Sequence, residues 1–335
     1  MVPNSSNHLS LFLDTNEFPE VLMRNFQKFP QATSDLVRFA LLCELGGIWL
    51  DVSCMVFCDL DDIWGVIQDP ETPYTMAGYI INFRQGEYHL LNNSALISQK
   101  GDALMKRWRD TFSALWQGRT SLNDIHQDLL VSWLGLAPGA ASEGMKHCEL
   151  KDEASLRTLT DYLAAYLCFE RLVLIQDPSD GFDGRAHWAN KVFKLDWTSD
   201  HAYVQEVTRY NGQRLFDLFA SQREGLAPEK RNQEAESLTN YVCTNTTIVK
   251  LFSGHGFMPP WLPVLWNQPE NADADIKEGS FIAFLRYAQV HLRSTRNLVT
   301  NVEAEAIPDG YVIRMGVCER KEVQLNRHVL GELKQ

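Results

Sequence analysis

The stretch SDLVRFALLCELGGIWLDVS, residues 34–53, predicts a helix, a double-glycine stop and a short strand that ends at a carboxylate. Ser34 suits a helix N-cap, and Asp35 follows where the helix dipole favours negative charge. Gly46 and Gly47 allow the left-handed backbone that commonly ends a helix. We expect the apolar run 48–50 to be an interior strand. Asp51 would then emerge at the carboxyl end of a central strand, where open α/β sheets place their ligands.

This ordered stretch resembles the signature of glycosyltransferases with a DXD-type sugar-binding region. It is most similar to the capsular polysaccharide synthesis protein family, which commonly carries Asp-x-Ser or Asp-x-Thr at this point. Weaker similarity covers roughly residues 10–290, including 92–94, 249–251 and 279–281. The resemblance implies an α/β fold with a glycosyltransferase A-type nucleotide-sugar-binding sheet flanked by helices, and a helical C-terminal elaboration. It also implies transfer of a hexosyl unit from a nucleoside-diphosphate sugar to a glycan or other hydroxyl acceptor.

Such a transfer needs a group that stabilises the diphosphate leaving group, which Mn²⁺ or Mg²⁺ does by neutralising charge. These cations prefer oxygen ligands and keep several waters, so one or two protein carboxylates suffice. Asp51 is therefore the expected metal ligand and catalytic carboxylate. Ser53, on the same side of an extended chain by period two, adds a hydroxyl to the metal and donor site. The alternative is that Asp51 merely caps a turn.

The resemblance suggests four further residues for the donor and the metal. Asp35 would contact the donor's sugar or ribose and Arg38 its sugar or phosphate, although a local ion pair between the two explains them equally well. Lys250 would meet the diphosphate as a point charge. His255, between two glycines, is the expected late metal or diphosphate ligand, with His187 as runner-up. A solvated loop histidine is the alternative for both.

The acceptor side is expected around residues 92–98, which resemble the strand that covers such sites. The helix beyond it carries Leu104, Trp108, Phe112 and Leu115 on one face, and we predict that this face is core. Residues 126–128 are expected to begin another helical stretch. The resemblance makes Asp128 or Asp124 the acceptor-side acid, and Asp128 the preferred catalytic candidate. A solvated helix start is the alternative for this segment.

Composition narrows the function classes. The 335 residues are 45% hydrophobic with a net charge of −12, and because no basic stripe occurs, nucleic-acid binding is disfavoured. No apolar run approaches the roughly 18 residues of a membrane-spanning helix. Seven scattered cysteines are compatible with a reducing compartment. Cys54 and Cys58 are expected to be core or near-core thiols, with a metal-binding pair as the alternative. The chain as it stands suggests the cytoplasm, and a Golgi or secretory location stays open if an N-terminal anchor precedes it.

We expect three segments: residues 1–220 as the nucleotide-sugar-binding domain, 221–303 as its loop-rich and helical completion, and 304–335 as a tail. Residues 9–13 are predicted to form a strand and 18–29 a helix, so the family's first strand and loop are expected to be absent. That absence and the single carboxylate favour the main alternative, a non-catalytic relative that has lost donor turnover. A glycoside hydrolase built on the acidic residues 59–62 is the second alternative, but we interpret them as a turn and helix start.

Overall fold

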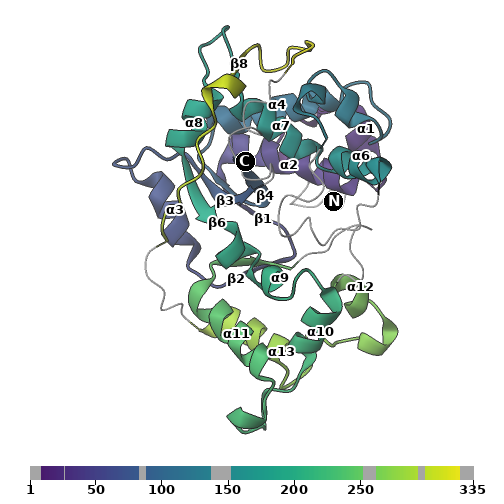
Figure 1. Cartoon of the computed structure of the whole chain (residues 1–335), viewed down its shortest axis with the longest axis vertical. Helices are drawn as coiled ribbons and strands as arrows, with labels where there is room; N and C mark the ends of the chain where they lie inside the picture. Colours follow the sequence, from purple (N-terminus) through teal and green to yellow (C-terminus); the bar gives the residue numbers. More distant parts are fainter. Residues whose placement is uncertain are drawn as a thin grey trace, which may run out of the picture.

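The computed structural model describes residues 9–25, 27–82, 88–136, 152–251, 262–292 and 299–324, which form an α/β fold around a mixed four-stranded sheet (Figure 1). The sheet order is β1-β4-β3-β6, where β1, β4 and β3 are antiparallel neighbours and β6 runs parallel to β3. Two small sheets pair β2 with β7 and β5 with β8. The strands are β1 (Gly47–Leu50), β2 (Cys54–Val56), β3 (Met76–Asn82), β4 (His89–Ser98), β5 (Ile175–Gln176), β6 (Val192–Asp196), β7 (Ile248–Lys250) and β8 (Ile313–Arg314).

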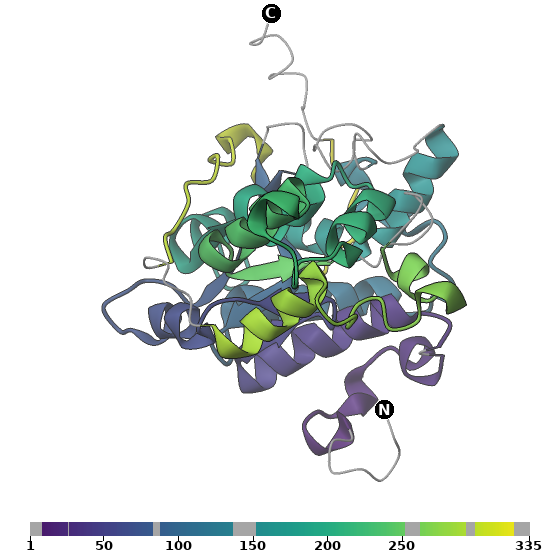
Figure 2. The same cartoon turned by 90° about the horizontal axis from the view of Figure 1, so that it is seen from below.

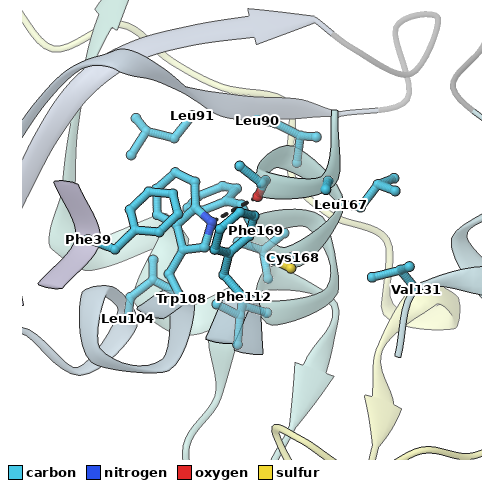
Figure 3. Close-up of a cluster of buried hydrophobic side chains, with 14 of the residues drawn as sticks. Phe39, Leu90, Leu91, Leu104, Trp108, Phe112, Val131, Leu167, Cys168 and Phe169 are labelled. Atoms are coloured by element: carbon cyan, nitrogen blue, oxygen red, sulfur yellow. Dashed lines mark hydrogen bonds between the residues drawn. The ribbon is translucent and has the colours of Figure 1, made fainter. Parts of the chain in front are cut away.

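Three helices cover one face of the sheet: α2 (Pro30–Leu45), α4 (Ala103–Trp116) and α7 (Ala164–Val173). Trp108 lies between the rings of Phe39 and Phe169, with centroid distances of 4.3 and 4.7 Å, and its indole N–H donates to the Ala165 carbonyl over 2.8 Å (Figure 3). Aromatic side chains in such contact contribute much of a core's stability. The predicted core face of α4 is confirmed, because its four apolar residues are all buried.

The opposite face of the sheet is covered by α3 (Leu60–Gln68) and by a π-helical turn, η5 (Trp197–His201). Side chains alternate between the faces along each strand, as the pleat requires. Leu96 belongs to the first core, whereas Ala95 and Ile97 belong to the second. Asp59 caps the start of α3, and the next two acidic residues lie in its first turn, which confirms the predicted helix start.

A second lobe of helices lies below the sheet in Figure 1 and faces the viewer in Figure 2. Its core packs against β2 and β7 and includes Met55, Val249, Leu238 and Phe281. The predicted helical C-terminal elaboration is therefore confirmed. The helices of this lobe are α9 (Tyr203–Val207), α10 (Gly212–Ala220), α11 (Gln233–Asn245), α12 (Leu262–Trp266) and α13 (Phe281–His291).

The remaining helices are α1 (Glu20–Arg24), α6 (Glu153–Tyr162) and α8 (Gly184–Lys191). The C-terminal segment returns to the first core: Arg171, fully buried on α7, donates to the carbonyls of Gly316, Val317 and Glu319. This packing anchors residues up to about 319, while the three predicted segment boundaries stay a prediction. Within the described ranges, the helices are all too short or too polar to cross a membrane.

The start of α2 differs from the prediction. Pro30 occupies the first helical position, which its fixed φ favours, so Ser34 is inside the helix and is not its N-cap. The predicted stop is confirmed: Gly46 and Gly47 have φ of +70° and +106°, and a Cβ on Gly46 would meet the Lys100 nitrogen at 2.6 Å. Both features place Asp35 and Arg38 in the buried middle of the helix.

Two strand predictions were wrong. Residues 48–50 do form a strand, but β1 is at the edge of the sheet and half-buried, because a short apolar run does not distinguish edge from centre. The strand expected at residues 9–13 is a 3-10 turn, η1 (Leu9–Leu11). Leu9 and Leu13 are buried against α2 while Leu11 and Phe12 are exposed, a four-residue spacing that suits a helical turn. The helix expected over 18–29 shortens to α1.

Candidate active site

The chain reverses directly after β1 in a tight turn that presents Asp51. The Cys54 amide donates to the Asp51 carbonyl over 2.9 Å, and Val52 is fully exposed at the tip. The Leu251 amide donates to the Ser53 carbonyl over 2.8 Å, which brings the end of β7 against this turn. The predicted extended chain is therefore wrong here, and period two does not place Ser53 beside Asp51. Its role as a metal or donor ligand stays a prediction.

Five side chains from three elements meet at this turn, and we call them the Asp51 cluster: Asp35, Arg38, Trp49, Asp51 and Lys250. Asp51 Oδ1 accepts from Arg38 Nη2 at 2.9 Å and from the Trp49 indole at 3.2 Å, while Oδ2 accepts from Lys250 Nζ at 2.6 Å. Arg38 also pairs with Asp35 at 3.2 Å and lies 5.3 Å from the Trp49 ring centroid. The structure thus brings together four predicted site residues from positions 35 to 250.

A large bulge in β4 lies against the Asp51 cluster and supports it. Leu91 pairs with Ile80 and Leu96 with Gly78, so β4 advances five residues while β3 advances two, and three extra residues lie in β4. Bulges break strand pairing and redirect side chains, and they are often found beside active sites. The predicted strand over residues 92–98 is confirmed, with this irregularity at its start.

The bulge bonds three members of the Asp51 cluster. The Asn93 carbonyl accepts from Arg38, and the Asn93 amide group donates to Asp35 over 3.0 Å. The Ser94 carbonyl accepts the Asp51 backbone N–H over 2.8 Å. Because Arg38 has hydrogen-bond partners on several sides and is buried, its guanidinium is fixed in place. Asn93 therefore holds both Arg38 and Asp35 in place from the β4 side of the site.

Exposure and charge distinguish the members of the cluster. The side chains of Asp35 and Arg38 are 4% and 5% exposed and that of Lys250 10%, whereas Asp51 is 24% exposed and faces solvent. Burial raises the pKa of Asp35 to about 6, although Arg38 opposes this. Burial acts the same way on Asp51, but the charges of Arg38 and Lys250 outweigh it and lower its pKa. Two carboxylates thus face two cations, and Asp51 is the open, firmly ionised one.

The raised pKa of Asp35 predicts a pH dependence of stability. The folded protein binds more protons than the unfolded chain between about pH 4 and 6, so the free energy of unfolding that Asp35 contributes falls as the pH rises through this window. Compared with the Asp35→Asn variant, the native protein should lose about 3 kcal/mol of stability between pH 4 and pH 7. Urea denaturation at several pH values measures this difference, and parallel curves for the two proteins would contradict it.

Other predicted site residues lie apart from the cluster. Asp128 accepts from Arg119 over 3.0 Å and from Arg320 over 3.1 Å at the end of a 3-10 turn, and Asp124 lies in the left-handed region just before that turn. The structure does not bring either of them to Asp51. His187 contacts Asp102 at the start of α4, at 3.1 Å. His255 lies outside the described residues.

The two cysteines after the turn, Cys54 and Cys58, are half-buried thiols, as expected. Cys54 lies on β2 with its sulfur 3.8 Å from the Ser94 carbonyl, and burial raises its pKa to about 11. A thiol with that pKa stays protonated at neutral pH, so Cys54 is not a reactive thiolate.

A divalent cation at this site would depend on Asp51. Across the residues that the structure describes, His, Cys, Asp and Glu side chains do not gather in groups of three or more that suit a metal ion. A carboxylate has about four acceptor positions, and three hydrogen bonds occupy Asp51. One position on its exposed side fits a cation whose other ligands are waters and phosphate oxygens.

Two members of the site were missed in the sequence. Trp49 was expected to be core, yet its indole bonds Asp51 and its ring lies against Arg38. The signal was present, because residues two apart on a strand share one face and Trp49 precedes Asp51 by two. Asn93 had no such signal: its contacts to α2 depend on the bulge, which the sequence does not reveal.

A mixed sheet flanked by helices thus presents a carboxylate and two buried cations at one edge, which is consistent with the glycosyltransferase fold expected from the sequence. The comparisons with known proteins agree. The chain belongs to the capsular polysaccharide synthesis protein family, whose model matches residues 14–152.

Three fungal relatives resemble nearly the whole chain. The O-glycosyltransferase braB of Annulohypoxylon truncatum is 34% identical over 96% of this chain and 77% of its own length. The glycosyltransferase afumC of Aspergillus fumigatus is 32% identical over 89% of this chain and 76% of its own. The O-glycosyltransferase PaGT of Phomopsis amygdali is 30% identical over 89% of this chain and 73% of its own length. No solved structure matches the chain significantly.

Proposed function

We propose that the chain transfers a hexosyl unit from a nucleoside-diphosphate sugar to a hydroxyl acceptor, with the Asp51 cluster as the donor site and Mn²⁺ or Mg²⁺ as cofactor. The pairing of a partly exposed carboxylate, Asp51, with two buried cations, Arg38 and Lys250, carries this proposal. Two relatives are named O-glycosyltransferases, which supports an oxygen acceptor. A glycan or a small hydroxyl compound fits equally well.

The chain's own residues supply the charge that a diphosphate requires. Arg38 is fixed by Asn93 and Trp49 and holds Asp51 in one orientation. Lys250 carries its ammonium on a flexible four-carbon stem, and this ammonium bonds Oδ2 of Asp51. The ammonium is therefore able to turn toward a phosphate oxygen. Lys250 would then neutralise charge on the leaving diphosphate.

The metal would bind Asp51 on its exposed side, with Ser53 as a candidate hydroxyl ligand, and would supply Lewis-acid neutralisation of the diphosphate. A cation alone is repelled by Arg38 and Lys250, whereas a diphosphate brings the negative charge that offsets them. Metal and nucleotide should therefore bind together rather than separately.

Calorimetric titration of the chain with UDP and with GDP, each with and without Mn²⁺, tests this function. We expect one nucleotide to bind at least about tenfold more tightly with Mn²⁺, and Mn²⁺ alone to bind weakly. Equal affinity with and without the metal would contradict the cofactor. A folded chain that binds neither nucleotide would contradict the donor site, and one that binds a donor sugar without transfer or hydrolysis would support the non-catalytic alternative.

A further inference from the structure

His201 is a fully buried histidine that the donor site does not use directly, yet it joins the two strands that form that site. It ends the π-helical turn η5 between β6 and α9. Its ring stacks on Tyr79 with centroids 4.2 Å apart and planes 16° from parallel. Such π-helical turns are rare and are frequently found at functional sites.

Both ring nitrogens of His201 have hydrogen-bond partners, which fixes the tautomer. Nδ1 lies 2.5 Å from the Ile248 carbonyl, and Nε2 lies 2.7 Å from the Ser94 hydroxyl. Because a carbonyl oxygen only accepts, Nδ1 carries the proton, and the unprotonated Nε2 faces the Ser94 hydroxyl, which also bonds Asn92 Oδ1. Burial lowers the pKa of His201 to about 3, so the ring is neutral at physiological pH and keeps this arrangement.

Each partner of His201 is linked to one member of the Asp51–Lys250 ion pair: Ser94 to Asp51, and Ile248 to Lys250. Ser94 is in the β4 bulge and accepts the Asp51 amide, whereas Ile248 lies two residues before Lys250 on β7. One helical turn after His201, the buried Gln205 donates to the carbonyl of Lys250 itself over 3.3 Å. The ring and this amide therefore set the position of β7 relative to the bulge.

We infer that His201, assisted by Gln205, is a positioning residue that places Lys250 against Asp51. This inference rests on the proposed function, in which Lys250 meets the diphosphate. Replacing His201 with Phe keeps the stacked ring but leaves the buried Ile248 carbonyl without its hydrogen bond and removes the polar contact with Ser94, so β7 is expected to shift. The Lys250 ammonium would then leave its position at the exposed side of Asp51.

The test measures the affinity for UDP or GDP, whichever the chain binds, in a double-mutant cycle. His201→Phe alone should weaken binding about tenfold, because the buried hydrogen bond to Ile248 and the contact with Ser94 that position Lys250 are lost. In a Lys250→Met background the same change should have little further effect, since the group it positions is absent. Additive losses in the cycle, or an unchanged affinity in His201→Phe, would overturn the inference.

Two further variants separate positioning from general loss of stability. Tyr88→Phe removes another buried hydroxyl, the one that donates to Glu170 in the first core, and should leave the affinity within about twofold at a similar loss of melting temperature. If His201→Phe does not fold, Gln205→Met should weaken binding in the same direction, and an unchanged affinity there would overturn the inference. A Lys250→Met variant that binds normally would instead contradict the proposed function.

Discussion

Asp51→Asn should abolish glycosyl transfer, with a loss of at least about a thousandfold in kcat/KM, while the protein stays folded. Asn keeps the size of the side chain and an oxygen that accepts from Arg38, so the turn after β1 is preserved. What is lost is the negative charge that faces solvent between Arg38 and Lys250. Without that charge, the cluster offers a divalent cation no solvent-exposed carboxylate, because Asp35 is buried.

The same variant should separate metal binding from nucleotide binding. Removing one of two carboxylates leaves Arg38 and Lys250 facing Asp35 alone, so the cluster gains net positive charge. We therefore expect UDP or GDP to bind Asp51→Asn without Mn²⁺, and Mn²⁺ to add nothing in calorimetry. Asp61→Asn, the same chemical change on the exposed start of α3, is the matched control and should keep native activity. Full activity of Asp51→Asn would exclude Asp51 as the catalytic carboxylate.

Local signals in the sequence were sufficient to predict much of the fold. The apolar face of α4, the glycine stop after α2 and the start of α3 each depend on residues a few positions apart, and the structure confirms all three. The edge position of β1 and the turn at residues 9–11 were not predictable in this way. Both depend on which surfaces of other elements cover them, and a short apolar segment carries no information about that.

The site shows the same division between local and distant contacts. Asp35 and Arg38 lie one turn apart on α2, and Asp51 follows a predicted strand, so motif resemblance located them together. The contact of Lys250 with Asp51 spans 199 residues and depends on the pairing of β2 with β7. His201 had no local signal, because both of its partners come from other strands.

Arg38→Met should have the second large effect, because it acts on both stability and activity. Asp35 would stay buried without the guanidinium, and breaking a buried ion pair by removing one partner costs about 3–5 kcal/mol. We expect a loss of this size in urea denaturation, together with loss of detectable transfer. Arg109→Met is the matched control, since Arg109 on α4 pairs with its neighbour Asp110 and with Glu44 at the exposed end of α2. Its effect should stay below about 1 kcal/mol.

The double variant Asp35→Asn/Arg38→Met distinguishes the two roles of Arg38. Neutralising Asp35 removes the uncompensated buried charge, so most of the lost stability should return. Transfer should not return, for two reasons. Asp51 would still lack the hydrogen bond from Arg38 that orients it, and the nucleotide-sugar site would still lack the positive charge of Arg38. Recovery of both stability and transfer would mean that Arg38 serves only to neutralise Asp35. Recovery of stability alone would assign Arg38 to the proposed donor site, where it would hold Asp51 in the orientation that we expect glycosyl transfer to require.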